Sequence, residues 1–172
     1  MKNKLSYLVL LPICFFAALF IIPQIIFKPI KHISLPEIQG YVQENNKYLT
    51  DTAQQLLLAQ GADNPVMKYN AKSEVPETID VDKLYNDLRI RYIFILKNHL
   101  DDEDCVEILL KDKNGNYNCG IYYSPAGKLL EHGVPKEGNQ YEYDGTPEGY
   151  RHKYRSEKIC DNWYYFEDDT WN

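Results

Sequence analysis

The residues best suited to chemistry in this chain are His99 and the acidic run Asp101–Asp104 that follows it closely. A histidine titrates near neutral pH and suits general acid–base catalysis, and several neighbouring carboxylates suit Ca²⁺. This group carries one hypothesis, a small hydrolase or metal-dependent enzyme that uses His99 and the Asp101–Asp104 region. The simpler interpretation is a solvated loop between two strands, and we assign no catalytic residue on this pattern alone.

Three cysteines, Cys105, Cys119 and Cys160, follow in the same part of the chain. They lack CxxC spacing and no histidine stands beside them, so we expect no metal site and no cofactor. An exported domain could form one disulfide, for which we prefer Cys119 with Cys160, because the hairpin described below puts Cys105 on the opposite face. Small buried hydrophobic residues are one alternative, and a nucleophilic pair of Cys119 with His152 is another.

Fifteen tyrosines are many for a chain of 172 residues, and several stand in a segment rich in turn residues, 131–154. Tyrosine is favoured in binding contacts, and long loops on rigid scaffolds often carry function. We therefore predict a ligand-binding surface made by this loop and an aromatic C-terminal hairpin. The alternative is that these side chains cover the second face of a sheet. The candidate residues are Tyr141, Tyr143, Tyr150, Trp163 and Tyr165.

The clearest element that could position such residues is a hairpin around Asn114-Gly115. Asn-Gly between two runs of β-branched and aromatic residues is a strong signal for a two-residue turn. The turn sets the register of the two runs and gives them one shared apolar face, while Glu107 and Asn118 fall on the other. The predicted pairs are 110 with 119, 108 with 121 and 106 with 123, and the apolar face is Val106, Ile108, Leu110, Cys119, Ile121 and Tyr123.

The helical spacing of apolar residues after Ser34 predicts an amphipathic helix of about 25 residues that ends near Gly61. Ser34 and Glu37 have the spacing of a capping box, which marks its start. The remaining predicted elements are a connecting loop at 62–78, a short helix at 81–88, a strand at 90–96 for which continued helix is the competitor, and a second hairpin at 157–167 that turns at Asp161-Asn162. The fold class is therefore α+β, with the long amphipathic helix packed on an antiparallel sheet of four or five strands.

Residues Leu5–Phe27 form an apolar run of 23 residues without a charge. A helix of that length spans about 34 Å, enough to cross the hydrocarbon core of a bilayer. No small-residue cleavage site follows, so we predict an N-terminal transmembrane helix, a retained signal anchor, rather than a cleaved signal peptide. This divides the chain into an anchor with its flanks at 1–33 and one small domain at 34–172. The expected arrangement is a single-pass protein of the cell membrane with an extracytoplasmic C-terminal domain.

The residues beyond Phe27 are acidic, because they hold all 25 Asp and Glu but only 17 of the 19 Lys and Arg, a net charge of −8. Nucleic acids and anionic lipid surfaces both attract clustered basic charge. We therefore expect no nucleic-acid partner and no domain that lies flat on lipid.

Two short motifs, Gly120–Ser124 and Asp161–Glu167, carry a resemblance to known proteins. Together with the short helix and strand before them, they resemble uncharacterised small single-pass membrane proteins of clostridia-type Gram-positive bacteria. The resemblance covers residues 36–167 and implies a helix followed by a β-meander that ends in a Trp-Tyr-Tyr strand. Trp163–Phe166 with Asp168 also resembles part of a choline-binding type cell-wall repeat, but it is a single copy and no glycine follows the aspartate.

These patterns favour a non-enzymatic, membrane-anchored extracytoplasmic domain that binds another envelope protein or a cell-wall ligand. The alternative remains the small enzyme built on His99 and the acidic run. A pocket that joins a histidine to carboxylates or to a cysteine would favour the enzyme, and an exposed aromatic face would favour the binding domain.

Overall fold

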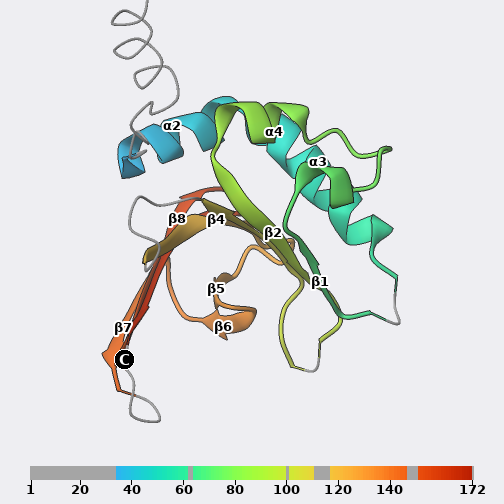
Figure 1. The fold of residues 1–172 in the computed structure, drawn as a ribbon. Coiled ribbons are helices and arrows are strands. Elements are labelled where there is room, and N and C mark those ends of the chain that lie inside the picture. Colours follow the sequence, from blue (N-terminus) through green and yellow to red (C-terminus); the bar gives the residue numbers. More distant parts are fainter. Residues whose placement is uncertain (1–33, 62–63, 100, 111–116, 147–150, 172) are drawn as a thin grey trace, which may run out of the picture. The chain divides into compact units, whose positions relative to one another are not determined.

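The computed structural model describes residues 34–61, 64–99, 101–110, 117–146 and 151–171. Their main element is a seven-stranded sheet in the order β1-β2-β3-β4-β9-β8-β7, which leaves β1 and β7 at its two edges (Figure 1). Every neighbouring pair in it runs antiparallel. The strands are β1 (Val66–Tyr69), β2 (Ile90–Leu96), β3 (Cys105–Leu110), β4 (Tyr117–Tyr123), β7 (Gln140–Gly145), β8 (Arg151–Cys160) and β9 (Trp163–Trp171).

Helices cover one face of this sheet, which we call the helix face (Figure 1). The first begins at Ser34, whose backbone N–H and hydroxyl both donate to the Glu37 carboxylate at 2.9 Å. This confirms the predicted capping box. The helical elements of the described residues are α2 (Leu35–Glu44), α3 (Asn46–Ala59), the 3₁₀ helix η1 (Lys72–Glu74) and α4 (Asp82–Asp87).

The main core lies between the helices and the helix face. Alternate residues of each strand point to this face, as the pleat of a strand requires, and the apolar stripes of α2 and α3 pack on them. Its most buried members are Ile38, Val42, Leu49, Ala53, Leu56 and Leu84 from the helices and Ile93, Ile95, Val106, Ile108, Ile121 and Trp163 from the strands.

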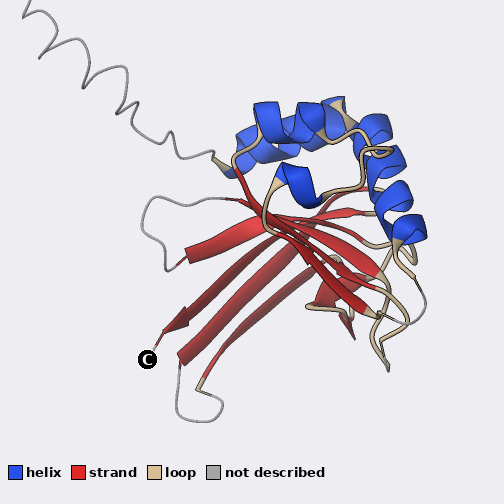
Figure 2. Ribbon diagram, turned by 45° about the vertical axis from the view of Figure 1, so that its right-hand side comes forward, coloured by secondary structure: helices blue, strands red, loops and turns tan. Residues whose placement is uncertain are grey.

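A second, smaller hairpin lies on the opposite face of the sheet, which we call the hairpin face. It pairs β5 (Leu129–Glu131) with β6 (Val134–Lys136) and forms a separate two-stranded sheet. Figure 2 shows the helices and this hairpin on opposite sides of the main sheet. Leu129 and Leu130 are each 1% exposed, because they pack on a second apolar cluster. That cluster includes Leu96, Cys105, Leu109, Tyr122, Tyr154, Tyr164 and Phe166.

Several elements confirm the sequence-based prediction. The β3–β4 pairing has the predicted register, with Leu110 opposite Cys119, Ile108 opposite Ile121 and Val106 opposite Tyr123. The Asn114-Gly115 turn itself lies outside the described residues. Residues 90–96 form a strand rather than a continued helix, and the C-terminal hairpin turns at 161–162 between β8 and β9.

The predicted fold class is wrong in its proportions. The sheet has seven strands instead of four or five, and the long helix is two short ones of 10 and 14 residues. The break falls at Asn45, whose side-chain amide donates to the Tyr41 carbonyl oxygen at 2.8 Å and so competes with the helix backbone. The two extra strands come from segments predicted as loops, because β1 lies within 62–78 and β7 lies within 131–154.

The predicted transmembrane helix also requires correction. Within the described part of the chain, no helix is both long enough and apolar enough to cross a membrane. The structure therefore does not support the description of a single-pass, signal-anchored membrane protein. Residues 5–27, to which the apolar run assigned the anchor, lie outside the described residues.

Candidate functional site

Four polar side chains gather on the hairpin face, although each comes from a different element. In the β8–β9 ladder, Asp168 lies opposite Tyr154, and His152 precedes Tyr154 by two residues on the same strand. Residues two apart on a strand share a face, so His152 and Asp168 are diagonal neighbours. The four side chains are Glu107 of β3, His132 of the β5–β6 turn, His152 of β8 and Asp168 of β9.

His132 reaches the site because it stands in a tight two-residue turn. Glu131 pairs with Val134, which leaves His132 and Gly133 as the two loop residues. Their φ angles are 48° and 92°, the left-handed conformations that a type I′ hairpin turn requires at both positions. The Gly133 carbonyl oxygen also accepts a hydrogen bond of 2.9 Å from the Glu103 backbone N–H, which fixes the tip of the hairpin to the loop after β2.

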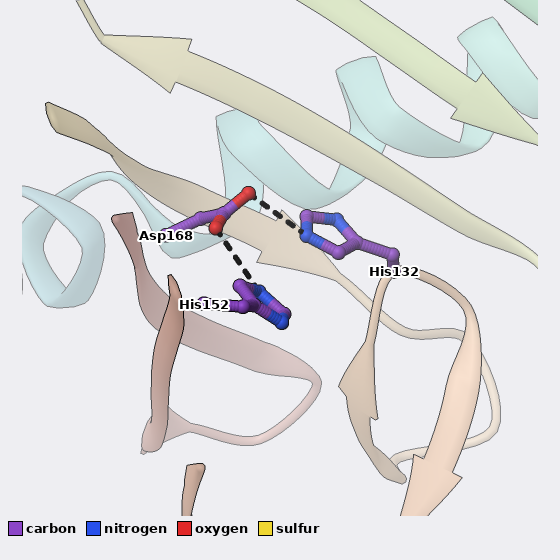
Figure 3. Close-up of side chains that lie close together, drawn as sticks. All are labelled: His132, His152 and Asp168. Atoms are coloured by element: carbon purple, nitrogen blue, oxygen red, sulfur yellow. Dashed lines mark hydrogen bonds and ion pairs between the residues drawn. The ribbon is translucent and has the colours of Figure 1, made fainter. Parts of the chain in front are cut away.

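Asp168 lies between the two histidines (Figure 3). Its Oδ2 is 3.2 Å from Nε2 of His132, and its Oδ1 is 3.2 Å from Nε2 of His152. On its other side, the His132 ring meets Glu107, whose Oε1 is 3.3 Å from Nδ1. Both nitrogens of the His132 ring therefore face a carboxylate.

The two carboxylates control the charge of His132. Burial lowers the pKa of the His132 ring, but the hydrogen bonds with Asp168 and Glu107 and the attraction of both carboxylates outweigh it and raise the pKa to about 10. The ring lies among protein atoms even though 43% of its side-chain surface is open to solvent. At neutral pH His132 is thus a cation that donates from both ring nitrogens in the metal-free site.

Aromatic rings surround the cluster and limit how its imidazoles can move. The His132 ring packs edge-on against Tyr154, with ring centres 5.1 Å apart, and the His152 ring lies 5.5 Å from that of Tyr143. Phe166 lies under His132 at 6.2 Å. The histidine cluster thus packs on aromatic rings, and such ring contacts favour particular orientations of the two imidazoles.

Two tyrosine hydroxyls fasten the hairpin that carries His132. The Leu130 backbone N–H donates to the hydroxyl oxygen of Tyr122 at 2.8 Å, and the Tyr154 hydroxyl donates to the Leu130 carbonyl oxygen at 3.1 Å. Burial raises the pKa of both tyrosines, so both hydroxyls remain protonated. Tyr122 and Tyr154 therefore pack on the hairpin face of the sheet and hold the β5–β6 hairpin against it.

The cluster offers a donor set for a metal ion. His132, His152 and Asp168 each provide one ligand atom, and the three atoms lie within 4.8 Å of one another. Two imidazole nitrogens and one carboxylate oxygen suit Zn²⁺ and related divalent transition metals. The histidine–carboxylate contact of Glu107 is also the usual arrangement behind a metal-bound histidine.

The residues predicted as a tyrosine-rich binding surface do not gather in one place. Tyr141 and Tyr143 lie half-buried on the hairpin face of β7 and pack against its apolar cluster. Trp163 and Tyr165 point to the helix face, where they are 0% and 4% exposed in the main core. Tyr150 lies outside the described residues.

The expected Cys119–Cys160 disulfide is not formed, since Cys160 is a free thiol and its sulfur accepts a hydrogen bond from Asn46. Cys119 is on β4 and Cys160 is on β8, on either side of β9. Cys119 lies opposite Glu167 of β9, whereas Cys160 lies opposite Trp163, four residues away along the same strand. Four residues of strand span about 13 Å, beyond the reach of about 7 Å that a disulfide permits between Cα atoms. The sheet also separates Cys119, on the helix face, from His152.

His99 and the acidic run form a local loop network. His99 Nδ1 is 2.8 Å from Asp102 Oδ2, and Asp104 accepts a hydrogen bond from the Asn98 backbone N–H. Glu103 forms an ion pair with Lys128. These contacts and the hydrogen bond from the Glu103 backbone N–H to the Gly133 carbonyl oxygen fix the loop against the β5–β6 hairpin.

A cavity of about 480 Å³ elsewhere on β7, β8 and β9 is lined mainly by charged residues, and neither His132 nor Asp168 is among them. Some of its charged side chains form ion pairs, such as Arg155 with Glu157 at 2.6 Å. The lining includes Tyr143 and Tyr154, which also pack on the histidines, but none of the four polar residues of the cluster.

Sequence patterns did not reveal the His132–His152–Asp168 cluster. Its residues are far apart in the chain and meet only through the pairing of β8 with β9 and the return of β5–β6 over the sheet. One local signal was present, because His132-Gly133 separates two short apolar runs in the manner of a hairpin turn. The placement of Glu107 opposite the apolar face of its strand was predicted.

Comparison of the chain with protein-family models, with curated proteins and with solved structures finds no match. The geometry of the cluster on the hairpin face is therefore the basis for assigning a function.

Proposed function

We propose that this domain binds a divalent transition-metal ion, such as Zn²⁺, through His132, His152 and Asp168. The observation that carries the proposal is the spacing of three donor atoms within 4.8 Å of one another. In a tetrahedral Zn²⁺ site, ligand atoms about 2.0–2.1 Å from the ion are about 3.3 Å from each other. Nε2 of His132 is 3.2 Å from Oδ2 of Asp168 and Nε2 of His152 is 3.2 Å from its Oδ1, which is close to this value, and rotation of the carboxylate would bring one oxygen toward both nitrogens.

Glu107 supports the proposal because it acts on the nitrogen of His132 that the metal does not need. When Nδ1–H donates to Glu107, the lone pair of Nε2 is directed toward Asp168 and His152. Carboxylates in this position fix the tautomer of a ligating histidine and raise its basicity. Glu107 is 5% exposed, so the strand holds it firmly in place.

In the metal-free protein the same atoms form an ion pair, because His132 carries a proton on Nε2 at neutral pH. A metal ion needs that lone pair and must displace the proton. The protonated, ion-paired state of His132 and its metal-bound state therefore exclude each other. Metal binding replaces the His132–Asp168 ion pair, which links the hairpin to the sheet, with a link through the metal ion.

The proposed function is a binding domain, the class expected from the sequence, but the proposed site is the histidine cluster rather than the tyrosines. We place no metal at His99, because its ring is paired with Asp102 in its own loop.

The test is a competition titration of the full chain, in which Zn²⁺ is shared with a chromophoric chelator. We expect one tight equivalent, and we expect His152→Gln and Asp168→Asn each to lower the affinity at least about 10–100-fold. His99→Gln is the matched control, because it removes an imidazole outside the cluster, and it should bind as the unmodified chain does. Circular dichroism checks that each variant is folded. Failure of the unmodified chain to compete, or an equal loss in His99→Gln, would contradict the proposal.

A further inference from the structure

The proposed metal site has three protein donors, and this number leaves room for a further ligand. Structural zinc sites use four protein ligands, whereas sites with three keep a position for water or another molecule. Solvent reaches the cluster on the His132 side, where 43% of the side-chain surface is exposed, while Asp168 and His152 are 18% and 17% exposed. The ion would therefore be accessible from one side.

A polar pair lies next to Asp168 on the same face of the sheet. Asn118 of β4 is directly opposite Asp168 in the β4–β9 ladder. The Asn118 side-chain oxygen accepts a hydrogen bond of 2.7 Å from Nη1 of Arg91, which is an exposed residue of β2. Because the amide oxygen of Asn118 accepts from Arg91, the amide NH₂ group of the same side chain is the part that can donate to a ligand. A guanidinium and an amide donor thus stand beside one metal ligand.

The charge balance of the loaded site favours an anion. A divalent ion, two neutral histidines and the carboxylates of Asp168 and Glu107 sum to zero. Arg91 adds one positive charge beside this neutral set of groups, although the domain as a whole is acidic. A small anion would meet both the metal and a guanidinium, whose planar fork matches the oxygens of carboxylate and phosphate groups.

We infer, on the basis of the proposed metal site, that the loaded site takes an oxyanion ligand, a carboxylate or phosphate group. One oxygen of this group coordinates the ion at its open position, and another accepts hydrogen bonds from Arg91 and Asn118. Arg91 and Asn118 are the positioning residues for the ligand and do not hold the metal.

The experiment uses the full chain loaded with Co²⁺, because its visible absorption reports coordination directly. Inorganic phosphate and acetate are titrated separately into the loaded protein. We expect a saturable change of the Co²⁺ spectrum with at least one of them, and the response to each anion distinguishes a phosphate site from a carboxylate site. The Arg91→Gln variant should weaken anion binding about tenfold or more, the effect of losing one charge-assisted hydrogen bond, and leave Co²⁺ affinity unchanged.

Arg89→Gln is the matched control, because Arg89 is a neighbouring arginine that precedes β2. It should change neither Co²⁺ nor anion binding. Normal Co²⁺ binding with no spectral response to either anion overturns this inference and leaves the metal site standing. Equal anion binding by Arg91→Gln and the unmodified chain also overturns it. Absence of Co²⁺ binding overturns the metal site and this inference together.

Discussion

Among single residues, the buried carboxylate of Glu107 has the strongest influence on the cluster. A carboxylate that is 5% exposed needs a partner, and in this domain the His132 ring provides it. The contact is reciprocal, because Glu107 holds the ring in one orientation while the charged ring compensates for the lost hydration of Glu107. Replacing either residue therefore changes the environment of the other.

This dependence leads to a prediction for Glu107→Gln. Glutamine keeps the volume and can still accept from Nδ1–H of His132, but it loses the charge that orients the ring and increases its basicity. We expect Zn²⁺ affinity to fall about 10–100-fold, measured by chelator competition at constant pH.

Glu142→Gln provides the control for this variant, because that side chain is 77% exposed on β7 and lies away from the cluster. It should bind Zn²⁺ like the unmodified chain. Equal affinities of Glu107→Gln and the unmodified chain would mean that Glu107 does not orient His132 for the metal.

Among the elements, the β5–β6 hairpin matters most, because it carries His132, a proposed metal ligand, on a turn of two residues. Gly133 is central to its docking. A Cβ atom at this position would lie 2.4 Å from Cδ2 of Leu96 and 3.1 Å from Cβ of Asp102, so the turn packs directly against the end of β2 and the β2–β3 loop. The close approach positions His132 over Asp168.

We therefore predict that Gly133→Ala destabilises the domain and weakens Zn²⁺ binding together. The added methyl must push the turn away from Leu96, with a cost of about 1–3 kcal/mol in the free energy of unfolding. Urea unfolding and chelator competition measure the two effects.

Gly138→Ala separates this contact from backbone strain. Gly138 also has a positive φ, 85°, but the nearest atom to its Cβ would be 3.9 Å away. Its alanine variant should show only the smaller cost of the left-handed backbone and bind Zn²⁺ normally. If the two variants behave alike, the packing of the turn on Leu96 does not position His132.

The elements that sequence analysis predicted correctly are those specified by near neighbours. The β3–β4 hairpin follows from Asn114-Gly115 and strict alternation, and the start of α2 follows from Ser34 with Glu37. β7 was missed because Gln140–Gly145 contains Glu142 and Asp144 and resembles a polar loop. Such a strand is specified by its long-range pairing with β8, which no local pattern reports.

At the scale of the whole molecule, the site arises from long-range pairing, so it could not be predicted from spacing. Glu107 and Asp168 are on strands separated by β4, and His132 arrives from a hairpin that belongs to a different sheet. The predicted aromatic surface had the right composition for the hairpin face. However, alternation sends Trp163 and Tyr165 into the main core instead.

Stability of the whole domain should depend on pH through His132. Its pKa in the folded state, about 10, is above the ordinary value of 6.5, so the folded state holds the proton more tightly than the unfolded chain does. The resulting stabilisation is complete below about pH 6.5 and is lost as the pH rises to about 10. Urea unfolding of the metal-free protein across this interval measures the decline.

The comparison for this prediction is His132→Gln, which cannot carry the proton and should show a flatter profile over the same interval. Parallel profiles for the two proteins would mean that the proton on His132 contributes nothing to folding. A chelator must be present in both series, because metal binding would add stability of its own.

The edge position of β7 also affects how copies of the molecule meet. An open edge presents unpaired backbone groups that can extend a sheet into a neighbouring molecule. Along β7, Glu142 and Asp144 alternate with half-buried tyrosines, and Gly145 closes the strand. A second copy aligned antiparallel on this edge would bring carboxylates against carboxylates. The same acidic residues that hid the strand from sequence analysis thus discourage β7 from starting an aggregate.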